Sequence, residues 1–174
     1  MSTPGGSAAL PIAHTVLRIL VVLNWISGAA IAVLLLALPT RRWIMSALEL
    51  SPGPEADQVV MGLRGIAVAG LVAIALNYVV LKRLLAIVET VRAGDPFVAA
   101  NALRLRTIAW ALLWMQVLSL VVAAIARLIS TQAHPLKIQA GFSIDGWLAV
   151  LLTFLLARVF AAGTVMRDDL EGTV

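Results

Sequence analysis

The chain has 174 residues, of which 61% are hydrophobic and only 13% are charged, and its mean hydropathy is +1.01. Soluble domains are about 45–50% apolar and about 25% charged, so a water-soluble domain with this composition would leave apolar segments uncovered. The formal net charge of +4 would suit a nucleic-acid partner, but several cations stand at the ends of apolar runs, where they set membrane topology. The composition therefore indicates an integral membrane protein without direct nucleic-acid binding.

Four apolar stretches predict an all-α fold, a bundle of four transmembrane helices. A helix needs about 20 apolar residues to cross about 30 Å of hydrocarbon. The spans are expected at residues 14–38, 59–81, 107–129 and 144–162, within a transmembrane domain of residues 14–163. Residues 1–13, which are small and rich in Gly and Pro, are expected to form a disordered tail, and residues 164–174 a short acidic tail. The first apolar run is too long for a signal peptide and follows no basic segment, so no cleavage is expected.

The segment between the second and third spans, residues 82–106, holds five of the thirteen basic residues. Its apolar residues keep a helical period through Val91, so helices two and three are expected to extend beyond the membrane, by about 18 Å, as a hairpin. Gly94 suits the left-handed position that ends a helix. Asp95 is expected to cap the next helix and Pro96 to occupy its first position.

Four spans place both termini and the hairpin on one side of the membrane. On that side the loops carry six cations, against three on the other. The six are Lys82, Arg83, Arg92, Arg104, Arg106 and Arg167, and the three are Arg41, Arg42 and Lys137. Cytoplasmic loops are richer in Lys and Arg, so we expect a multi-pass protein of the inner (cytoplasmic) membrane with cytoplasmic N- and C-termini.

Few polar residues fall inside the spans. Asn24 and Gln116 both fall near mid-depth, which permits a mutual hydrogen bond worth about 0.6–2 kcal/mol. Two interpretations stay open: a polar site in a small-ligand cavity, or a structural pair of satisfied amides. Arg158 is expected either to reach the lipid headgroups or to join Asn77 and the tail in a polar cluster.

Small residues recur at every fourth position and would allow helices to approach closely. These faces comprise Gly28 and Ala32; Gly65, Ala69 and Ala73; and Ala149, Thr153, Ala157 and Ala161.

The sequence offers no set of residues typical of an enzyme, so no catalytic residue, cofactor or metal is expected. No span carries a mid-depth Asp or Glu, which argues against a carrier that depends on a buried carboxylate. His14 and His134 are expected on opposite sides of the membrane, where they cannot share a metal ion or complete one catalytic triad. The chain has no cysteine, which excludes thiol chemistry, and it has no glycine-rich phosphate loop.

Two segments carry distinctive motifs. The first has the pattern Gly-x-Pro-Phe…Asn…Arg-Leu-Arg, and the second the closing pattern Val-Phe…Gly…Thr-Val. The residues of these motifs are Gly94, Pro96, Phe97, Asn101, Arg104, Leu105, Arg106, Val159, Phe160, Gly163, Glu171, Thr173 and Val174. Both motifs resemble those of a known family of small bacterial membrane proteins, the domain of unknown function 2975 (DUF2975). Arg158 departs from the pattern, where an acidic residue would be expected. Phe97, Asn101 and Arg104 share a helical face, onto which we expect the C-terminal tail to fold.

The resemblance implies four transmembrane helices and no assigned reaction. Members are often encoded beside a small helix-turn-helix regulator, which suggests a membrane partner for a cytoplasmic regulatory protein. The leading hypothesis is a non-enzymatic membrane protein whose hairpin and tail form an interaction surface. The alternatives are an oligomeric small-molecule or lipid transporter and an accessory subunit of a membrane complex. The expected partners are thus the lipid bilayer, a cytoplasmic regulator and further copies of the chain.

Overall fold

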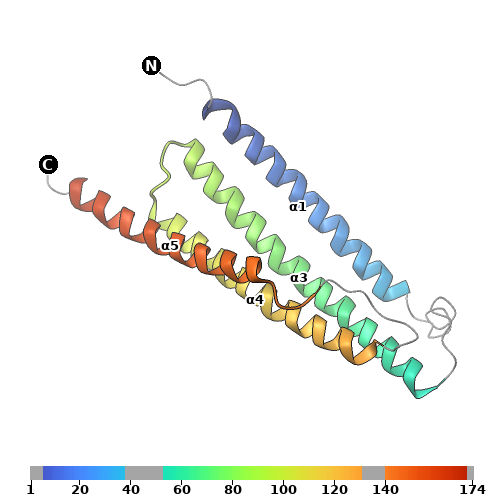
Figure 1. Cartoon of the computed structure of the whole chain (residues 1–174). Helices are drawn as coiled ribbons and strands as arrows, with labels where there is room; N and C mark the ends of the chain where they lie inside the picture. Colours follow the sequence, from blue (N-terminus) through green and yellow to red (C-terminus); the bar gives the residue numbers. More distant parts are fainter. Residues whose placement is uncertain (1–5, 38–52, 131–139, 172–174) are drawn as a thin grey trace. The chain divides into compact units, whose positions relative to one another are not determined.

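The computed structural model describes residues 6–37, 53–130 and 140–171. The described residues form four helices (Figure 1), which are α1 (Gly6–Ala37), α3 (Pro54–Arg92), α4 (Ala99–Ile129) and α5 (Ile144–Glu171). Each is long and apolar enough to cross a membrane. The prediction of an all-α protein with four membrane-spanning helices is confirmed at this level.

Three helices are longer than the sequence predicts: α1, α5 and α3, which begins at Pro54 rather than at residue 59. α1 begins at Gly6, so residues 6–13 are helical rather than a disordered tail. Ala8, Ala9 and Leu10 are strong helix formers, and the helix continues through Pro11 although this residue lacks a backbone hydrogen-bond donor. α5 continues to Glu171, because no proline interrupts the helix after the fourth span. The described part of the expected C-terminal tail is therefore a straight continuation of α5.

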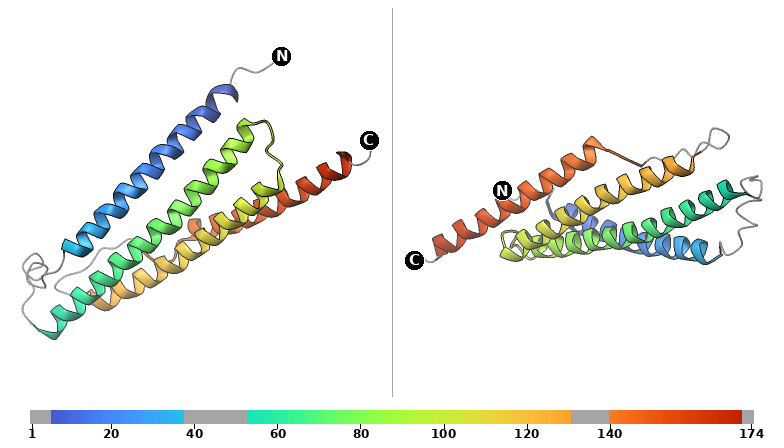
Figure 2. Two further views of the ribbon diagram at one scale, coloured as in Figure 1. Left: turned by 180° about the vertical axis from the view of Figure 1, so that it is seen from behind. Right: turned by 90° about the horizontal axis from the view of Figure 1, so that it is seen from below.

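Contacts divide the chain into two units. The first contains residues 1–24, 76–114 and 144–174, and the second contains residues 25–75 and 115–143. α1, α3 and α4 each contribute one part of their length to each unit. Figures 1 and 2 show each of these helices along its whole length.

Glycines set the distance between helices in the second unit. A Cβ atom at Gly62 of α3 would lie 2.9 Å from the Cδ1 atom of Ile129 of α4. A Cβ atom at Gly28 of α1 would lie 2.9 Å from the Cγ2 atom of Ile74 of α3. The close approach expected at Gly28 is therefore present, and the tightest position of α3, Gly62, lies one turn before the face that the sequence indicated.

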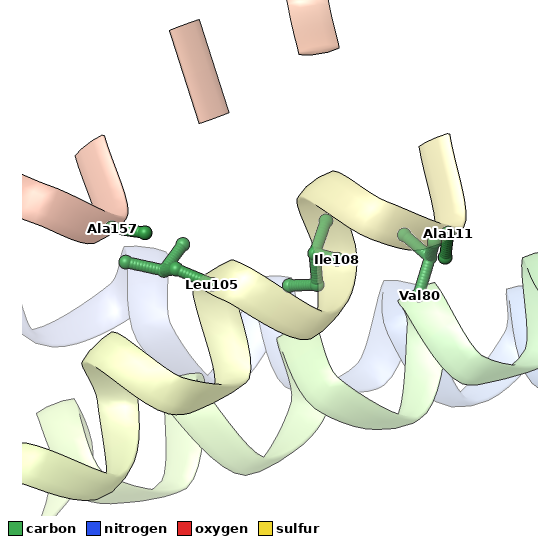
Figure 3. Close-up of a cluster of buried hydrophobic side chains, with 5 residues drawn as sticks. All are labelled: Val80, Leu105, Ile108, Ala111 and Ala157. Atoms are coloured by element: carbon green, nitrogen blue, oxygen red, sulfur yellow. The ribbon is translucent and has the colours of Figure 1, made fainter. Parts of the chain in front are cut away.

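An apolar core joins α3, α4 and α5 in the first unit. Its buried members (Figure 3) are Val80, Leu105, Ile108, Ala111 and Ala157. Outward-facing side chains of the same helices are also large and apolar: Trp114 is 57% exposed and Leu155 is 58% exposed. Helices that are apolar on both their inner and outer faces are typical of a lipid environment.

We predict that Gly62→Ala lowers the stability of the protein. Ile129 is 5% exposed and β-branched, so its side chain has little freedom to move away from an added methyl group. Overpacking of this kind costs about 1–3 kcal/mol. Thermal unfolding in detergent, followed by circular dichroism, would measure the loss.

Gly65→Ala is the matched control, because a Cβ atom there would lie 3.6 Å from the Cδ1 atom of Ile125, an ordinary contact. Its stability should stay equal or rise by up to about 1 kcal/mol, since Ala favours a helix more than Gly. Equal melting temperatures for Gly62→Ala and the unmodified protein would contradict the packing argument.

A candidate interaction site at the corner between α3 and α4

The corner between α3 and α4, residues 93–98, begins with a regular helix stop. Gly94 has a φ of +86°, which an L side chain rarely adopts. The Gly94 N–H donates to the carbonyl of Val91 at 3.1 Å, and the Asp95 N–H donates to the carbonyl of Thr90 at 3.1 Å. These two bonds form a Schellman motif, which satisfies the last carbonyls of α3. The expectation that Gly94 ends the helix is confirmed.

The start of α4 differs from the prediction. α4 begins at Ala99, after a non-helical stretch, so Pro96 is not its first residue and Asp95 does not cap it. The Asp95 carboxylate instead pairs with the guanidinium of Arg167 from α5. The predicted cap was wrong because a cation distant in the sequence binds the side chain that would have made it.

Asn101 joins the two arms of the corner and is 0% exposed. Its Nδ2 donates to the Thr90 hydroxyl at 2.7 Å and to the Pro96 carbonyl at 2.8 Å. Its backbone N–H donates to the carbonyl of Val98 at 2.8 Å. One buried amide thus links the end of α3, the corner and the first turn of α4. The end of the tail that was expected to fold onto this face, residues 172–174, lies outside the described residues.

Arg104 extends the network along α3. Its Nη1 donates to the Asn101 Oδ1 at 2.8 Å and to the carbonyl of Ala86 at 3.0 Å. The Thr90 hydroxyl donates in turn to the carbonyl of Ile87 at 2.8 Å. Buried polar groups stabilise a structure only when each has a partner, and this network supplies one at every step.

α5 packs against the corner through an aromatic pair. The ring centroids of Phe97 and Phe160 are 5.3 Å apart, with an angle of 31° between the ring planes. A Cβ atom at Gly163 would lie 3.3 Å from Cδ1 of Phe97, so glycine allows the ring to approach the helix backbone. With the ion pair of Asp95 and Arg167, α5 has both an apolar and a charged contact with the corner. The surface formed here is the corner surface, defined by Arg92, Ala93, Gly94, Phe97 and Ala100.

The structure brings together most of the residues singled out from the sequence, but not all. Gly94, Asp95, Pro96, Phe97, Asn101, Arg104, Phe160 and Gly163 meet at the corner. Arg106 and Arg158 instead line a separate groove between α4 and α5. Glu171 is the last residue of α5, and Thr173 lies outside the described residues.

Asn24 has a partner that the sequence did not assign to it. The Nδ2 of Asn77 donates to the Oδ1 of Asn24 at 2.9 Å, and Asn24 is 5% exposed. Gln116 belongs to the other unit, and its pairing with Asn24 stays a prediction. Asn77 was considered only as a neighbour of Arg158, since its depth alone does not reveal which amide it faces.

Thr90 and Arg167 are site residues that sequence reasoning missed. The only sequence signal for Thr90 was its hydroxyl group, four residues before the glycine that ends the helix. Arg167 was counted as a topology cation, although an exposed acid at the corner offered it a partner. Among the described residues, no group of His, Cys, Asp or Glu side chains is arranged to hold a metal ion.

We predict that Asn101→Ala lowers the free energy of unfolding by about 2–4 kcal/mol. The substitution removes partners from Thr90, Pro96 and Arg104 in a site that water does not reach. Thr107→Ala is the control, since Thr107 makes only an exposed bond to the carbonyl of Leu103. It should change stability by less than about 0.5 kcal/mol. Equal unfolding of both variants in detergent would contradict a stabilising role for Asn101.

Comparison with known proteins gives one match. Residues 66–174 match the family model described as "Protein of unknown function (DUF2975)". This range contains the corner, α4 and α5. No curated protein and no solved structure matches the chain. Because the matched residues make up more than half of the sequence, the chain belongs to the DUF2975 family of proteins of unknown function.

Proposed function

We propose that this protein is a non-enzymatic protein of the inner membrane that presents the corner surface to a protein partner in the cytoplasm. The observation that carries the proposal is the fully buried Asn101, whose hydrogen bonds tie the end of α3 to the corner. A binding surface held in advance on rigid elements loses less conformational entropy when a partner docks. The family resemblance suggests a small helix-turn-helix regulator as the partner.

The distribution of cations supports a cytoplasmic corner. Lys82, Arg83 and Arg92 at the end of α3 are all exposed, as is Arg106 near the start of α4. The sequence has six loop cations on the side of the corner and three on the opposite side. Those three, in residues 38–52 and 131–139, lie outside the described residues. By the positive-inside rule, this excess of cations favours a cytoplasmic location for the corner and both termini.

The chemistry of the corner surface suits protein recognition. Phe97 is 46% exposed although its ring packs on Phe160, so one face remains free for a partner. Arg92, the last residue of α3, is also exposed. Aromatic and arginine side chains contribute most of the energy at many protein interfaces. A basic and aromatic surface of this kind is complementary to an acidic patch on a small cytoplasmic protein.

Cysteine labelling in intact cells tests the orientation. The chain has no cysteine, so Ala93→Cys and Ser143→Cys each create a single thiol at an exposed position. A membrane-impermeant maleimide added outside should label Ser143→Cys and leave Ala93→Cys unmodified until the cells are opened. Labelling of Ala93→Cys from outside would place the corner on the wrong side for a cytoplasmic partner.

Co-purification tests the partner. The protein and a helix-turn-helix regulator encoded beside it should co-purify from detergent, and Arg92→Glu should reduce the recovered regulator about tenfold or more, because hot-spot residues contribute about 1–2 kcal/mol or more. Arg83→Glu makes the same charge change on the same helix, outside the corner surface, and should leave recovery unchanged. Equal recovery with both variants would contradict binding at the corner.

A further inference from the structure

A groove lies between α4 and α5. Its volume is about 400 Å³, within the range of small-ligand sites. Residues with apolar side chains provide most of the lining, and two arginines complete it; the lining includes Leu103, Arg106, Phe154, Ala157, Arg158 and Ala161. We infer that this groove binds an anionic glycerophospholipid, with its phosphate between Arg106 and Arg158 and an acyl chain along the apolar lining. This inference goes beyond the proposed protein partner and does not depend on it.

Small side chains create the hollow. Ala157 is 7% exposed and packs into the core with Leu105, so the floor of the groove is fixed by the core of the unit. Ala161, one turn further along α5, lines the groove without filling it. An unfilled groove beside lipid would lose dispersion contacts, so a flexible acyl chain is the natural occupant.

The two arginines supply charge complementarity. Arg106 and Arg158 are both exposed, and neither has an ion pair or hydrogen bond with any side chain that the structure describes. Arg158 stands between apolar residues of α5, where an uncompensated cation is costly. A phosphate group matches guanidinium geometry and charge, and basic pockets between helices on the cytoplasmic side are suited to anionic headgroups.

The order of residues along the groove fits the orientation of a lipid. Arg106 is the last charged residue of α4 before its long apolar stretch, so it marks the border of the hydrocarbon region. Beyond that border the rings of Trp110 and Phe154 meet edge to face, with centroids 5.6 Å apart and an interplanar angle of 88°. Phe154 lines the groove, and this aromatic pair is placed to contact an acyl chain whose phosphate lies at the arginines.

The lining also favours a whole lipid over a free phosphate ion. Inorganic phosphate would satisfy the two guanidinium groups but would leave the apolar lining beyond them, including Phe154, without a partner. A phospholipid satisfies both kinds of surface at once. Phosphatidylcholine, which has no net charge, would gain the apolar contacts without the net charge complementarity.

Native mass spectrometry of the full chain, released from neutral detergent, tests the inference. Phosphatidylglycerol should bind with higher affinity than phosphatidylcholine. Arg106→Gln and Arg158→Gln should each weaken phosphatidylglycerol binding about fivefold, and the double variant about 25-fold, as expected for one cation each near an anionic headgroup. Arg92→Gln, which removes the same charge outside the groove, should bind as the unmodified protein does.

A second pair of variants distinguishes lipid binding in the groove from general electrostatic attraction of anionic lipid to a basic protein. Ala161→Leu fills the groove and keeps both arginines, whereas Ala162→Leu adds the same volume at an exposed position outside the lining. Only Ala161→Leu should weaken phosphatidylglycerol binding. Three results would each overturn the inference: equal binding of the two lipids, full binding by the double arginine variant, or binding of inorganic phosphate as tight as that of phosphatidylglycerol.

Discussion

The corner between α3 and α4 depends on one buried amide group. Asn101 is the only polar side chain that the structure describes as fully buried. Its amide nitrogen donates to Thr90 and Pro96, and its amide oxygen accepts a hydrogen bond from Arg104. An unpaired amide in this position would cost about 1–3 kcal/mol, so its partners must stay in place. The positions of Thr90 and Arg104 follow from this requirement. α5 then packs on the corner through the contact of Phe160 with Phe97.

Hydropathy predicted the helices because membrane-spanning segments must satisfy their own backbone hydrogen bonds. Each of the four apolar runs therefore had one available secondary structure. The helix end at Gly94 could be predicted equally well, since a positive φ at the end of α3 leaves few alternatives to glycine. These features depend on local composition, and local composition is what a single sequence reports.

The helix ends and the polar partners could not be predicted in the same way. Asp95 is well suited to cap a helix, yet its carboxylate pairs with Arg167, 72 positions away in the sequence. Asn24 was matched by depth with Gln116, whereas its bond to Asn77 depends on how α1 packs on α3 within the first unit. At the start of α1, residues 6–13 continue the helix beyond the apolar stretch. These helix ends and polar partners depend on tertiary contacts, which hydropathy and residue spacing do not reveal.

The length of α3 has a mechanical consequence. Its 39 residues span about 58 Å, while the hydrocarbon layer is about 30 Å thick. Even at a tilt of about 40°, the steepest that is usual, the helix would cover about 45 Å along the membrane normal, which equals the whole bilayer with its headgroups. At any ordinary tilt, α3 is therefore longer than the hydrocarbon layer is thick. Because this excess length can be accommodated by tilting, a thicker or thinner bilayer would favour a different tilt of α3.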